Sequence, residues 1–297
     1  MSGLDKPRRM RELFAQPGII VCPGVYDGLT VKLVEQAGFD VAVVSGAAVS
    51  ASLLGAPDLG VMSMTELLQQ VRNIVGASDI PIIADAETGF GGVQNVVRTV
   101  RALEQAGVAA YILEDQTQNR KCGHFADKSV IPTSEMVLKL KAAVKTRENP
   151  DVVLIARTDA LEIEGIDAAI ARARAYAEAG ADCLFVEAPR TPEHMEYIIS
   201  SLKDTGLPLK ANMAEGGLTP MYSAAELEKI GFKLVTYPGG CQKVVVKMVS
   251  AFLRSLKETG SIDEFYPSKM ASLAERSAVL GLTDYLQFET DLLAESS

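Results

Sequence analysis

A cysteine and a histidine lie close together in residues 120–124, which read Arg-Lys-Cys-Gly-His. The segment follows a hydrophobic run that ends in the two acids Glu114 and Asp115. Positive charge next to a thiol favours the thiolate, so this pattern predicts a reactive Cys122 with His124 beside it. An unreactive cysteine in a charged surface loop fits the same five residues equally well. The choice between the two depends on the residues that fold around this segment.

Acidic residues recur at the ends of successive hydrophobic runs along the chain. They are Asp27, Asp58, Asp85, Glu87, Glu114, Asp115, Asp159, Glu187 and Glu215. Acids that converge on one edge of a sheet repel one another unless cations share the space. Oxygen ligands without any histidine or cysteine spacing favour Mg²⁺ or Mn²⁺ over zinc.

The strongest candidates for metal ligands are Asp85, Glu87 and Glu114. Residues 85 and 87 point the same way from a strand, so both side chains are expected to face one ion. Asp27 and Glu215 are explained equally well as helix caps or as ion-pair partners of nearby cations.

Three further features suit an anionic substrate. Residues 45–47, Ser-Gly-Ala, lead into a helix and offer backbone N–H groups to a carboxylate or phosphate. Arg157 stands in an apolar run, where a long cation needs a fixed anionic partner. Asn212 follows a strand and offers a neutral hydrogen bond. The glycine-rich loop 89–92 is expected to be supple, as a lid or a close ligand approach requires.

Four segments share a pattern in which a helix ends at a glycine and a short β-branched run follows. They are 35–46, 104–115, 178–187 and 228–239. Further strands are predicted at 18–22, 81–84, 152–156 and 208–211, and helices at 93–105, 134–145, 167–178 and 224–230. Eight strand–helix units in succession predict an α/β fold, the (β/α)8 TIM barrel. A doubly wound open sheet is the alternative, but no Gly-x-Gly-x-x-Gly follows the first strand.

We expect the catalytic barrel to span residues 1–258 and a C-terminal helical extension to span 259–297. The extension carries apolar residues that have no place inside a closed barrel. They are Leu273, Val279, Leu280, Leu282, Tyr285, Leu286 and Phe288. The extension is therefore expected to pack on the outside of the barrel or against a neighbouring subunit.

Composition excludes several classes of function. The net charge is −9 and tryptophan is absent, so we expect no nucleic-acid partner. The four cysteines are widely spaced, which argues against a disulfide framework or a zinc site. No apolar run approaches the length of a membrane span, and the N-terminus has no secretory pattern. The sequence predicts a cytoplasmic protein.

Longer motifs around the cysteine segment resemble one known family. They are 23–27 (Pro-Gly-Val-Tyr-Asp), 45–46 (Ser-Gly), 50–52 (Ser-Ala-Ser), 58–60 (Asp-Leu-Gly), 85–91 (Asp-Ala-Glu-Thr-Gly-Phe-Gly), 113–116 (Leu-Glu-Asp-Gln), 121–124 (Lys-Cys-Gly-His), 156–159 (Ala-Arg-Thr-Asp), 186–188 (Val-Glu-Ala), 211–212 (Ala-Asn) and 215–220 (Glu-Gly-Gly-Leu-Thr-Pro). Together they resemble the isocitrate lyase/phosphoenolpyruvate mutase superfamily over nearly the whole chain. The segment 121–124 is similar to the lyase branch, which includes 2-methylisocitrate and 2,3-dimethylmalate lyases. Phosphoenolpyruvate mutases lack this cysteine.

The resemblance implies a homotetramer that exchanges its eighth helix between subunits, and it implies a set of site residues. The ligands of Mg²⁺ would be Asp85 and, through water, Asp58, Glu87 and Glu114. The groups that bind the α-keto carboxylate would be Ser45, Gly46, Ala47 and Arg157. Those that bind the second carboxylate would be Gly123, His124, Glu187 and Asn212. The residues expected in the chemistry are Cys122, His124, Glu114 and Arg157.

The implied reaction cleaves the C2–C3 bond of a small 2-hydroxy di- or tricarboxylate, leaving an α-keto acid such as pyruvate and a carboxylate such as propionate or succinate. Cys122 would protonate the carbanion, and loop 116–131 would close over the site. Hydrolysis or decarboxylation of a 2-oxo acid, oxaloacetate, is the alternative. Phosphonate chemistry is disfavoured by the cysteine.

Three positions depart from the family pattern. Glu87 stands where close relatives usually have aspartate, and Val43 stands where methylisocitrate lyases tend to have tyrosine. Lys243 is the nearest candidate for the arginine that would bind a third carboxylate, and an ammonium matches a carboxylate less well than a guanidinium does. These departures favour a smaller, alkyl-substituted malate such as 2,3-dimethylmalate.

Overall fold

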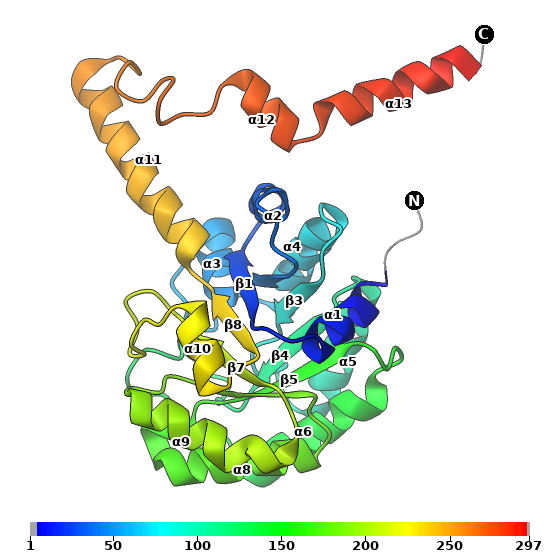
Figure 1. Cartoon of the computed structure of the whole chain (residues 1–297), viewed down its shortest axis with the longest axis vertical. Helices are drawn as coiled ribbons and strands as arrows, with labels where there is room; N and C mark the ends of the chain where they lie inside the picture. Colours follow the sequence, from blue (N-terminus) through cyan, green and yellow to red (C-terminus); the bar gives the residue numbers. More distant parts are fainter. Residues whose placement is uncertain (1–4, 296–297) are drawn as a thin grey trace.

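The computed structural model describes residues 5–295 and contains a closed barrel of eight parallel strands in sequential order (Figure 1). The strands are β1 (Ile20–Val25), β2 (Ala42–Val44), β3 (Ile82–Asp85), β4 (Ala110–Glu114), β5 (Val153–Thr158), β6 (Cys183–Val186), β7 (Leu209–Asn212) and β8 (Leu234–Tyr237). Pairing of β1 with β8 closes the barrel. The predicted fold class is confirmed, and the open-sheet alternative is wrong.

Helices surround the barrel and alternate with its strands. They are α1 (Lys6–Ala15), α2 (Gly28–Gln36), α3 (Gly46–Val49), α4 (Met64–Gly76), α5 (Val93–Gln105), α6 (Thr133–Thr146), α7 (Ala160–Glu164), α8 (Ile166–Glu178), α9 (Pro192–Leu202), α10 (Ala224–Ile230), α11 (Gly240–Thr259), α12 (Leu273–Val279) and α13 (Leu282–Glu295). Two short turns of other helical types occur, at Ser50–Leu54 and Lys203–Thr205. The predicted bounds of α5 and α10 agree with the structure.

Two hydrophobic layers hold the barrel. The outer layer packs the strands against the helices, for example Val71 of α4 and Leu140 of α6, both fully buried. The inner layer fills the barrel and includes Ile83 and Ile155. Because both faces of each strand are covered, the strands appear in the sequence as unbroken apolar runs rather than alternating ones.

A lysine lies inside the barrel below the carboxyl ends of the strands. Lys210 on β7 pairs with Phe185 on β6, and its Nζ lies 3.4 Å from the centre of the phenyl ring. Burial lowers the pKa of Lys210 to about 8, and the charge of Glu187 only partly opposes this shift. The barrel interior therefore becomes polar toward the rim on this side.

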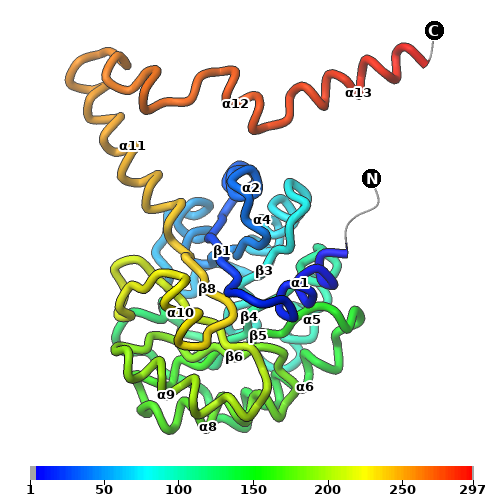
Figure 2. The backbone as a smooth tube through the Cα atoms, in the orientation of Figure 1, coloured from blue at the N-terminus to red at the C-terminus, as the bar shows by residue number. Residues whose placement is uncertain are grey.

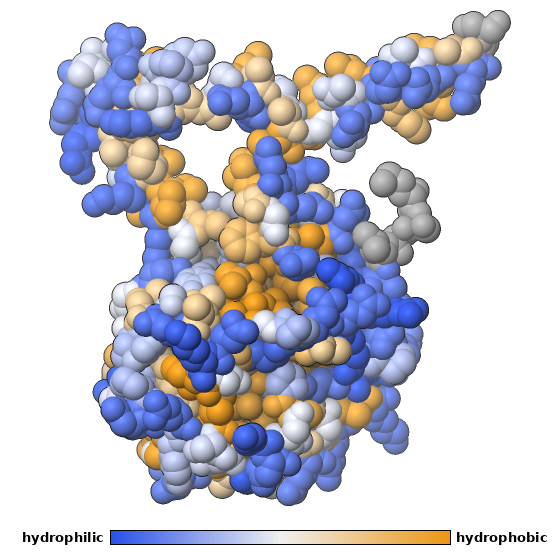
Figure 3. Space-filling model, viewed as in Figure 1, coloured by the Kyte–Doolittle hydropathy of each residue, from blue (hydrophilic) through white to orange (hydrophobic). Residues whose placement is uncertain are grey.

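The last three helices form an arm that leaves the barrel (Figure 2). α11 begins beside β8 but runs outward, and α12 turns back to pass near α2. The arm does not cover β1 and β8, and an apolar groove of about 690 Å³ remains there, bounded by α2 and the start of α11. Figure 3 shows hydrophobic side chains gathered on this face of the molecule.

None of the helices within residues 5–295 combines the length and apolar character that a membrane crossing requires.

Candidate active site

The predicted site residues lie where successive strands end, and they form two groups of side chains. We define the acid cluster as Asp58, Asp85, Glu87 and Glu114. We define the Glu187 cluster as His124, Arg157, Glu187 and Asn212. The strand register joins the two clusters, because Glu114 on β4 pairs with Arg157 on β5.

A guanidinium group lies among the side chains of the acid cluster. Arg120 Nε lies 2.6 Å from Oε1 of Glu114. Arg120 Nη1 lies 2.5 Å from Oδ1 of Asp58 and 3.2 Å from Oε1 of Glu87. Arg120 is 4% exposed and Glu114 is fully buried. Buried charges of this kind are tolerated only when each has a partner, so these contacts are mutually dependent.

The prediction that Asp85 and Glu87 point the same way from one strand is wrong, although both carboxylates do belong to the acid cluster. β3 ends at Asp85, and Glu87 lies in the following turn with a φ of 50°. The backbone N–H of Glu87 donates to Oδ1 of Asp85 at 3.0 Å. A left-handed turn, rather than strand alternation, brings the two side chains together. A Cβ added to Gly46 would lie 3.1 Å from an oxygen of each carboxylate, so a residue without a side chain suits this position.

Burial of the acid cluster opposes the ionisation of two of its carboxyl groups. Burial raises the pKa of Glu87 to about 8, and the charge of Arg120 only partly opposes this shift. Burial also raises the pKa of Glu114 to about 7, against the charges of Arg120 and Arg157. Oε2 of Glu114 is buried and accepts no hydrogen bond within residues 5–295, but Nη1 of Arg157 lies 3.3 Å from it.

The donor chemistry of the acid cluster fits a hard divalent cation, because all four side chains end in carboxylate oxygens. Within the described part of the chain, however, no three acidic, histidine or cysteine side chains are already grouped as a metal site. Three of the four acids contact Arg120 instead. An ion bound by all four acids therefore requires Arg120 to move.

Glu187 organises the second cluster. Nε2 of His124 lies 3.0 Å from Oε1 of Glu187, and Nδ1 of His124 accepts the backbone N–H of Leu218 at 3.0 Å. Because Nδ1 is an acceptor, the proton of a neutral His124 lies on Nε2 and faces Glu187. The amide of Asn212 lies 3.3 Å from both Glu187 oxygens, and Thr236 donates to the other end of that amide at 2.7 Å.

Arg157 connects the two clusters and is held in a fixed position. It donates two hydrogen bonds to Asp159, at 2.8 and 2.9 Å, and so has the anionic partner that its apolar surroundings predicted. Its guanidinium also lies 3.3 Å from Glu114 and 3.6 Å from Glu187. Burial opposes the ionisation of Glu187, but the charge of Arg157 and the contact with His124 outweigh burial and hold the pKa of Glu187 well below its usual range.

Asp115 holds the end of β5 in place through hydrogen bonds. Its position after β4 in the sequence did not reveal this role. Its carboxylate accepts the hydroxyls of Thr158 and Tyr176 and the backbone N–H of Asp159. Arg172 lies 3.3 Å from the same carboxylate. Asp115 therefore fixes the end of β5 from which Arg157 and Asp159 extend.

The loop 116–131 lies folded over the site. Its base is closed by an antiparallel bridge between Gln116 and Val130. The amide of Gln116 also binds both the carbonyl and the N–H of Lys121, at 2.9 and 3.0 Å. Lys128, which sequence reasoning missed, is 9% exposed and donates to the carbonyl of Gly123. These bonds make the loop a defined lid.

Cys122 lies on the lid, where burial opposes the thiolate that the neighbouring cations favour, and its role as a general acid stays a prediction. Burial is the largest effect, and it raises the pKa of the Cys122 thiol above its ordinary value. Arg120, the cation two residues earlier, contacts the acid cluster. The backbone N–H of Cys122 donates to the carbonyl of Asp58 at 3.2 Å, which ties the thiol-bearing segment to the loop after β2. A protonated thiol is suited to donate a proton.

Gly123 makes the closest approach of the lid to the site. A Cβ at this position would overlap the guanidinium of Arg157 and would lie 2.7 Å from Cγ of Glu187. Ser45, on the acid-cluster side, caps α3 by accepting the N–H of Ala48 at 3.3 Å. Residues 45–47 therefore form the turn that faces the acid cluster at Gly46, and their role in substrate binding stays a prediction.

Similar proteins of known family indicate which class of enzyme has this site. The family model for phosphoenolpyruvate phosphomutase matches residues 10–257. The 2,3-dimethylmalate lyase of Eubacterium barkeri is 42% identical over 286 residues, which cover 96% of this chain and 98% of that protein. The chain belongs to the phosphoenolpyruvate mutase/isocitrate lyase superfamily.

Two further relatives place it within that superfamily. The 2-methylisocitrate lyase of Bacillus subtilis is 41% identical over 86% of this chain and 83% of its own length. A structure of oxaloacetate acetylhydrolase with the inhibitor 3,3-difluorooxalacetate superposes with a TM-score of 0.92 at 31% identity, covering 98% of each chain. This superfamily member is an enzyme of the carbon–carbon lyase type.

Two acids near the rim of the lyase have local structural roles. Asp27 caps α2 and accepts the N–H of Thr30 at 2.7 Å. Glu215 pairs with Lys243 at 3.2 Å. The helix-cap and ion-pair explanations of these two acids agree with these contacts.

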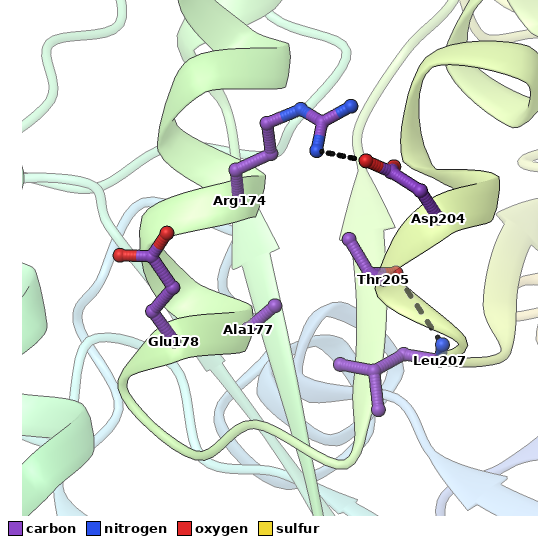
Figure 4. A pocket seen from close by; sticks show the side chains of 6 residues that line it. All are labelled: Arg174, Ala177, Glu178, Asp204, Thr205 and Leu207. Carbon is purple, nitrogen blue, oxygen red and sulfur yellow. Dashed lines mark hydrogen bonds and ion pairs between the residues drawn. The ribbon is translucent and has the colours of Figure 1, made fainter.

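A surface depression of about 330 Å³ lies away from the strand ends that carry the site. Figure 4 shows its lining between α8 and the end of α9, with Arg174 turned toward Asp204. The two side chains form an ion pair at 2.9 Å, and both are well exposed. Exposed pairs of this kind are ordinary surface features, so the site of the lyase is assigned to the barrel rim.

The substitution Gly123→Ala should prevent the lid from closing, because the added methyl overlaps Arg157 and Glu187. We expect Cys122 to react with iodoacetamide about tenfold faster or more in this variant, measured by mass spectrometry of the Cys122 peptide. Gly76→Ala is the control, since a Cβ at Gly76 meets no atom within 4 Å. Alkylation of Gly123→Ala at the wild-type rate would show that the lid does not depend on this contact.

Proposed function

We propose that this lyase cleaves the C2–C3 bond of a small 2-hydroxy dicarboxylate, of the 2,3-dimethylmalate type, with Mg²⁺ as cofactor. One observation carries the proposal. Arg157 joins an acid cluster to a second polar cluster, and a lid that bears a protonated thiol closes over both. The similarity to 2,3-dimethylmalate and 2-methylisocitrate lyases supports the same reaction.

The acid cluster is the proposed metal site. Asp85 would bind the ion directly, with Asp58, Glu87 and Glu114 acting through water. Bound there, Mg²⁺ would supply Lewis-acid stabilisation of the substrate's hydroxyl oxygen and neighbouring carboxylate. Mn²⁺ offers the same preference for oxygen ligands and is the alternative ion.

The two clusters divide the task of binding the substrate. Arg157 and the turn 45–47 would hold the carboxylate next to the hydroxyl, since Arg157 lies between the two clusters. The second carboxylate would meet Gly123, His124 and Asn212. Glu187 holds the side chains of His124 and Asn212 in position, so it orders these donors for the substrate.

Cys122 is the proposed general acid. As the C2–C3 bond breaks, the hydroxyl on C2 gives its proton to a base and C2 becomes the carbonyl of the keto acid. The electron pair of the broken bond stays on C3 as a carboxylate-stabilised carbanion. The thiol of Cys122 then gives its proton to C3. Burial keeps this thiol protonated at neutral pH, and the lid keeps water from competing for the carbanion.

Two residues favour a dicarboxylate over a tricarboxylate. Lys243, the candidate for binding a third carboxylate, donates to both the carbonyl and the side chain of Glu215. It is therefore already paired. Val43 offers no polar group to a third carboxylate. A substituted malate with alkyl groups suits this site better than 2-methylisocitrate.

Oxaloacetate is the second candidate substrate, and one observation favours it. The structure of oxaloacetate acetylhydrolase matches 98% of this chain with a TM-score of 0.92. Hydrolysis or decarboxylation of oxaloacetate would use the same metal and Arg157 but would depend less on Cys122. The products separate these reactions, since hydrolysis yields oxalate and acetate.

The arm suggests an assembly of several copies, and we propose the tetramer implied by the family. Large apolar side chains are exposed along α11, α12 and α13, including Leu253, Leu273, Tyr285 and Phe288. The groove of about 690 Å³ beside β1 and β8 lacks the eighth helix that normally covers a barrel at this position. The arm of a second copy fits both surfaces. The substrate class and the four free cysteines suit the cytoplasm.

Cys122→Ser should lower turnover of the substituted malate by about 10²- to 10⁴-fold, because a serine hydroxyl is a far weaker acid than a thiol. Substrate binding should survive, as measured by isothermal titration of the inactive variant. Cys241→Ser, which alters another partly buried thiol, is the control and should keep full turnover. Wild-type turnover in Cys122→Ser would remove Cys122 from the acid role.

Asp85→Asn should abolish Mg²⁺-dependent turnover, because the ligand expected to contact the ion directly loses its charge. Electron paramagnetic resonance of added Mn²⁺ measures the same loss as an increase in free ion. Asp40→Asn changes an exposed acid far from the cluster and should bind Mn²⁺ as the wild type does. An Asp85→Asn enzyme that turns over without any divalent ion would contradict the metal assignment.

The double substitution Val249→Glu and Leu253→Glu should dissociate the assembly, because it places charge on the exposed apolar face of α11. Each apolar side chain contributes roughly 1.5–3 kcal/mol when fully buried. Sedimentation velocity at micromolar concentration should show a smaller species than the wild type. Lys257→Glu, on the same helix, is the control. A wild-type chain that sediments as a monomer would contradict the proposed assembly.

A further inference from the structure

A lysine is buried inside the barrel and forms no ion pair within residues 5–295. Lys210 on β7 is 2% exposed. The ion pairs of Glu187 in the described part of the chain reach His124 and Arg157 instead. The interior of a barrel of this kind normally holds branched apolar side chains. Because a buried charge without a paired opposite charge costs stability, folding alone does not account for a lysine at this position.

Strand alternation places Lys210 one layer beneath the site. Asn212 follows it by two residues on β7, so the two side chains point to the same side of the strand. Nζ of Lys210 lies 3.4 Å from the centre of the Phe185 ring, and Phe185 stands two residues before Glu187. The guanidinium carbon of Arg157 lies 5.3 Å from the centre of the same ring. The ammonium therefore lies on the inner side of the Glu187 cluster, and one aromatic ring contacts both cations.

The Glu187 cluster needs positive charge if it binds a carboxylate. In the proposed function, the second carboxylate of the substrate meets donors that include His124 and Asn212, and Glu187 contacts both of them. An ionised Glu187 repels a second negative charge placed beside it. Arg157 offsets this repulsion only in part, because three carboxylates already share its guanidinium. Lys210 is the nearby cation that no carboxylate within residues 5–295 has paired.

We infer that Lys210 is a positioning residue for the second carboxylate of the substrate, and that its charge balances Glu187 from inside the barrel. Lys210 acts through Glu187 and does not touch the substrate. Cleavage adds negative charge to the same carboxylate, because the carbanion at C3 is shared with it, so the fixed ammonium also favours the intermediate. The inference rests on the proposed function, since it concerns the same carboxylate.

The charge of Lys210 depends on pH in the neutral to alkaline range. Burial lowers the pKa of Lys210 to about 8, and Glu187 only partly opposes this shift. The other charged or titratable groups that face the ammonium are Arg157, Cys183 and Cys22. Burial raises the pKa of Cys183 to about 12 and raises that of Cys22 as well, while the pKa of Arg157 lies well above its ordinary value. Among these groups, Lys210 is the one that changes charge between pH 7 and 9.

The first test measures ligand binding by isothermal titration of the full-length enzyme with Mg²⁺ at pH 7, in a Cys122→Ser background that suppresses turnover. Lys210→Met should bind 2,3-dimethylmalate about tenfold more weakly or worse, because the balancing charge is lost. Oxalate, whose adjacent oxygens suit the metal and Arg157 but do not extend to Asn212, should bind within about threefold of the parent. Lys141→Met removes an exposed charge on α6 and should leave both affinities unchanged.

Thermal unfolding distinguishes this role from a structural one. Lys210→Met replaces a buried cation by an apolar side chain of similar length, so its Tm should equal or exceed that of the parent. A lower Tm, with equal weakening of both ligands, would show that Lys210 supports the fold and would overturn the inference. If Lys210→Met does not fold, Lys210→Gln is the second neutral variant.

The dependence of binding on pH is a further readout. Between pH 7 and 9 the parent should lose affinity for 2,3-dimethylmalate by a factor about fivefold or more larger than Lys210→Met does, since only the parent loses the ammonium. An equal loss in the two proteins would overturn the inference.

The outcomes separate this inference from the proposed function. A parent that binds 2,3-dimethylmalate, with a Lys210→Met variant that binds it equally well, would overturn the role of Lys210 and leave the proposed function intact. A parent that binds oxalate but no 2,3-dimethylmalate would overturn the proposed substrate and the inference with it.

Discussion

The compensation of buried negative charge at one end of the barrel governs the arrangement of this enzyme. Glu114 and Glu187 are each almost completely shielded from water, and Arg157 lies between them. Removing carboxylates from water is costly unless cations stand beside them. The pairing of β4 with β5 places Glu114 next to Arg157, so the fold itself supplies this compensation.

The same constraint explains the lid. Loop 116–131 brings two further cations to the rim, Arg120 to the acid cluster and Lys128 to the neighbourhood of Asp159. Folding the lid down thus relieves the charge that the barrel concentrates at its rim. It also brings Cys122 and Gly123 to the site, where Gly123 fits because it lacks a side chain. Loop 116–131 therefore both positions the thiol of Cys122 and brings cations to the acids at the rim.

Much of this could be predicted from the sequence. Unbroken β-branched runs after helix-ending glycines indicated the barrel, and strand ends indicated which residues meet at the rim. The local conformation of individual site residues was less predictable than the fold. The left-handed turn at Glu87 follows no pattern in residue type, and the protonation of Cys122 depends on burial that appears only when the lid is folded. Arg120 could be seen beside the cysteine in the sequence, but the orientation of its side chain depends on a contact with Asp58, which lies 62 positions earlier.

The central claim is that this enzyme breaks a carbon–carbon bond in a substituted malate. The most direct measurement is NMR of the products after incubation of the purified enzyme with Mg²⁺ and 2,3-dimethylmalate, 2-methylisocitrate or oxaloacetate in separate reactions. The account predicts pyruvate and propionate from 2,3-dimethylmalate, at a rate above that of the other two. Oxalate and acetate from oxaloacetate, with no cleavage of 2,3-dimethylmalate, would contradict it.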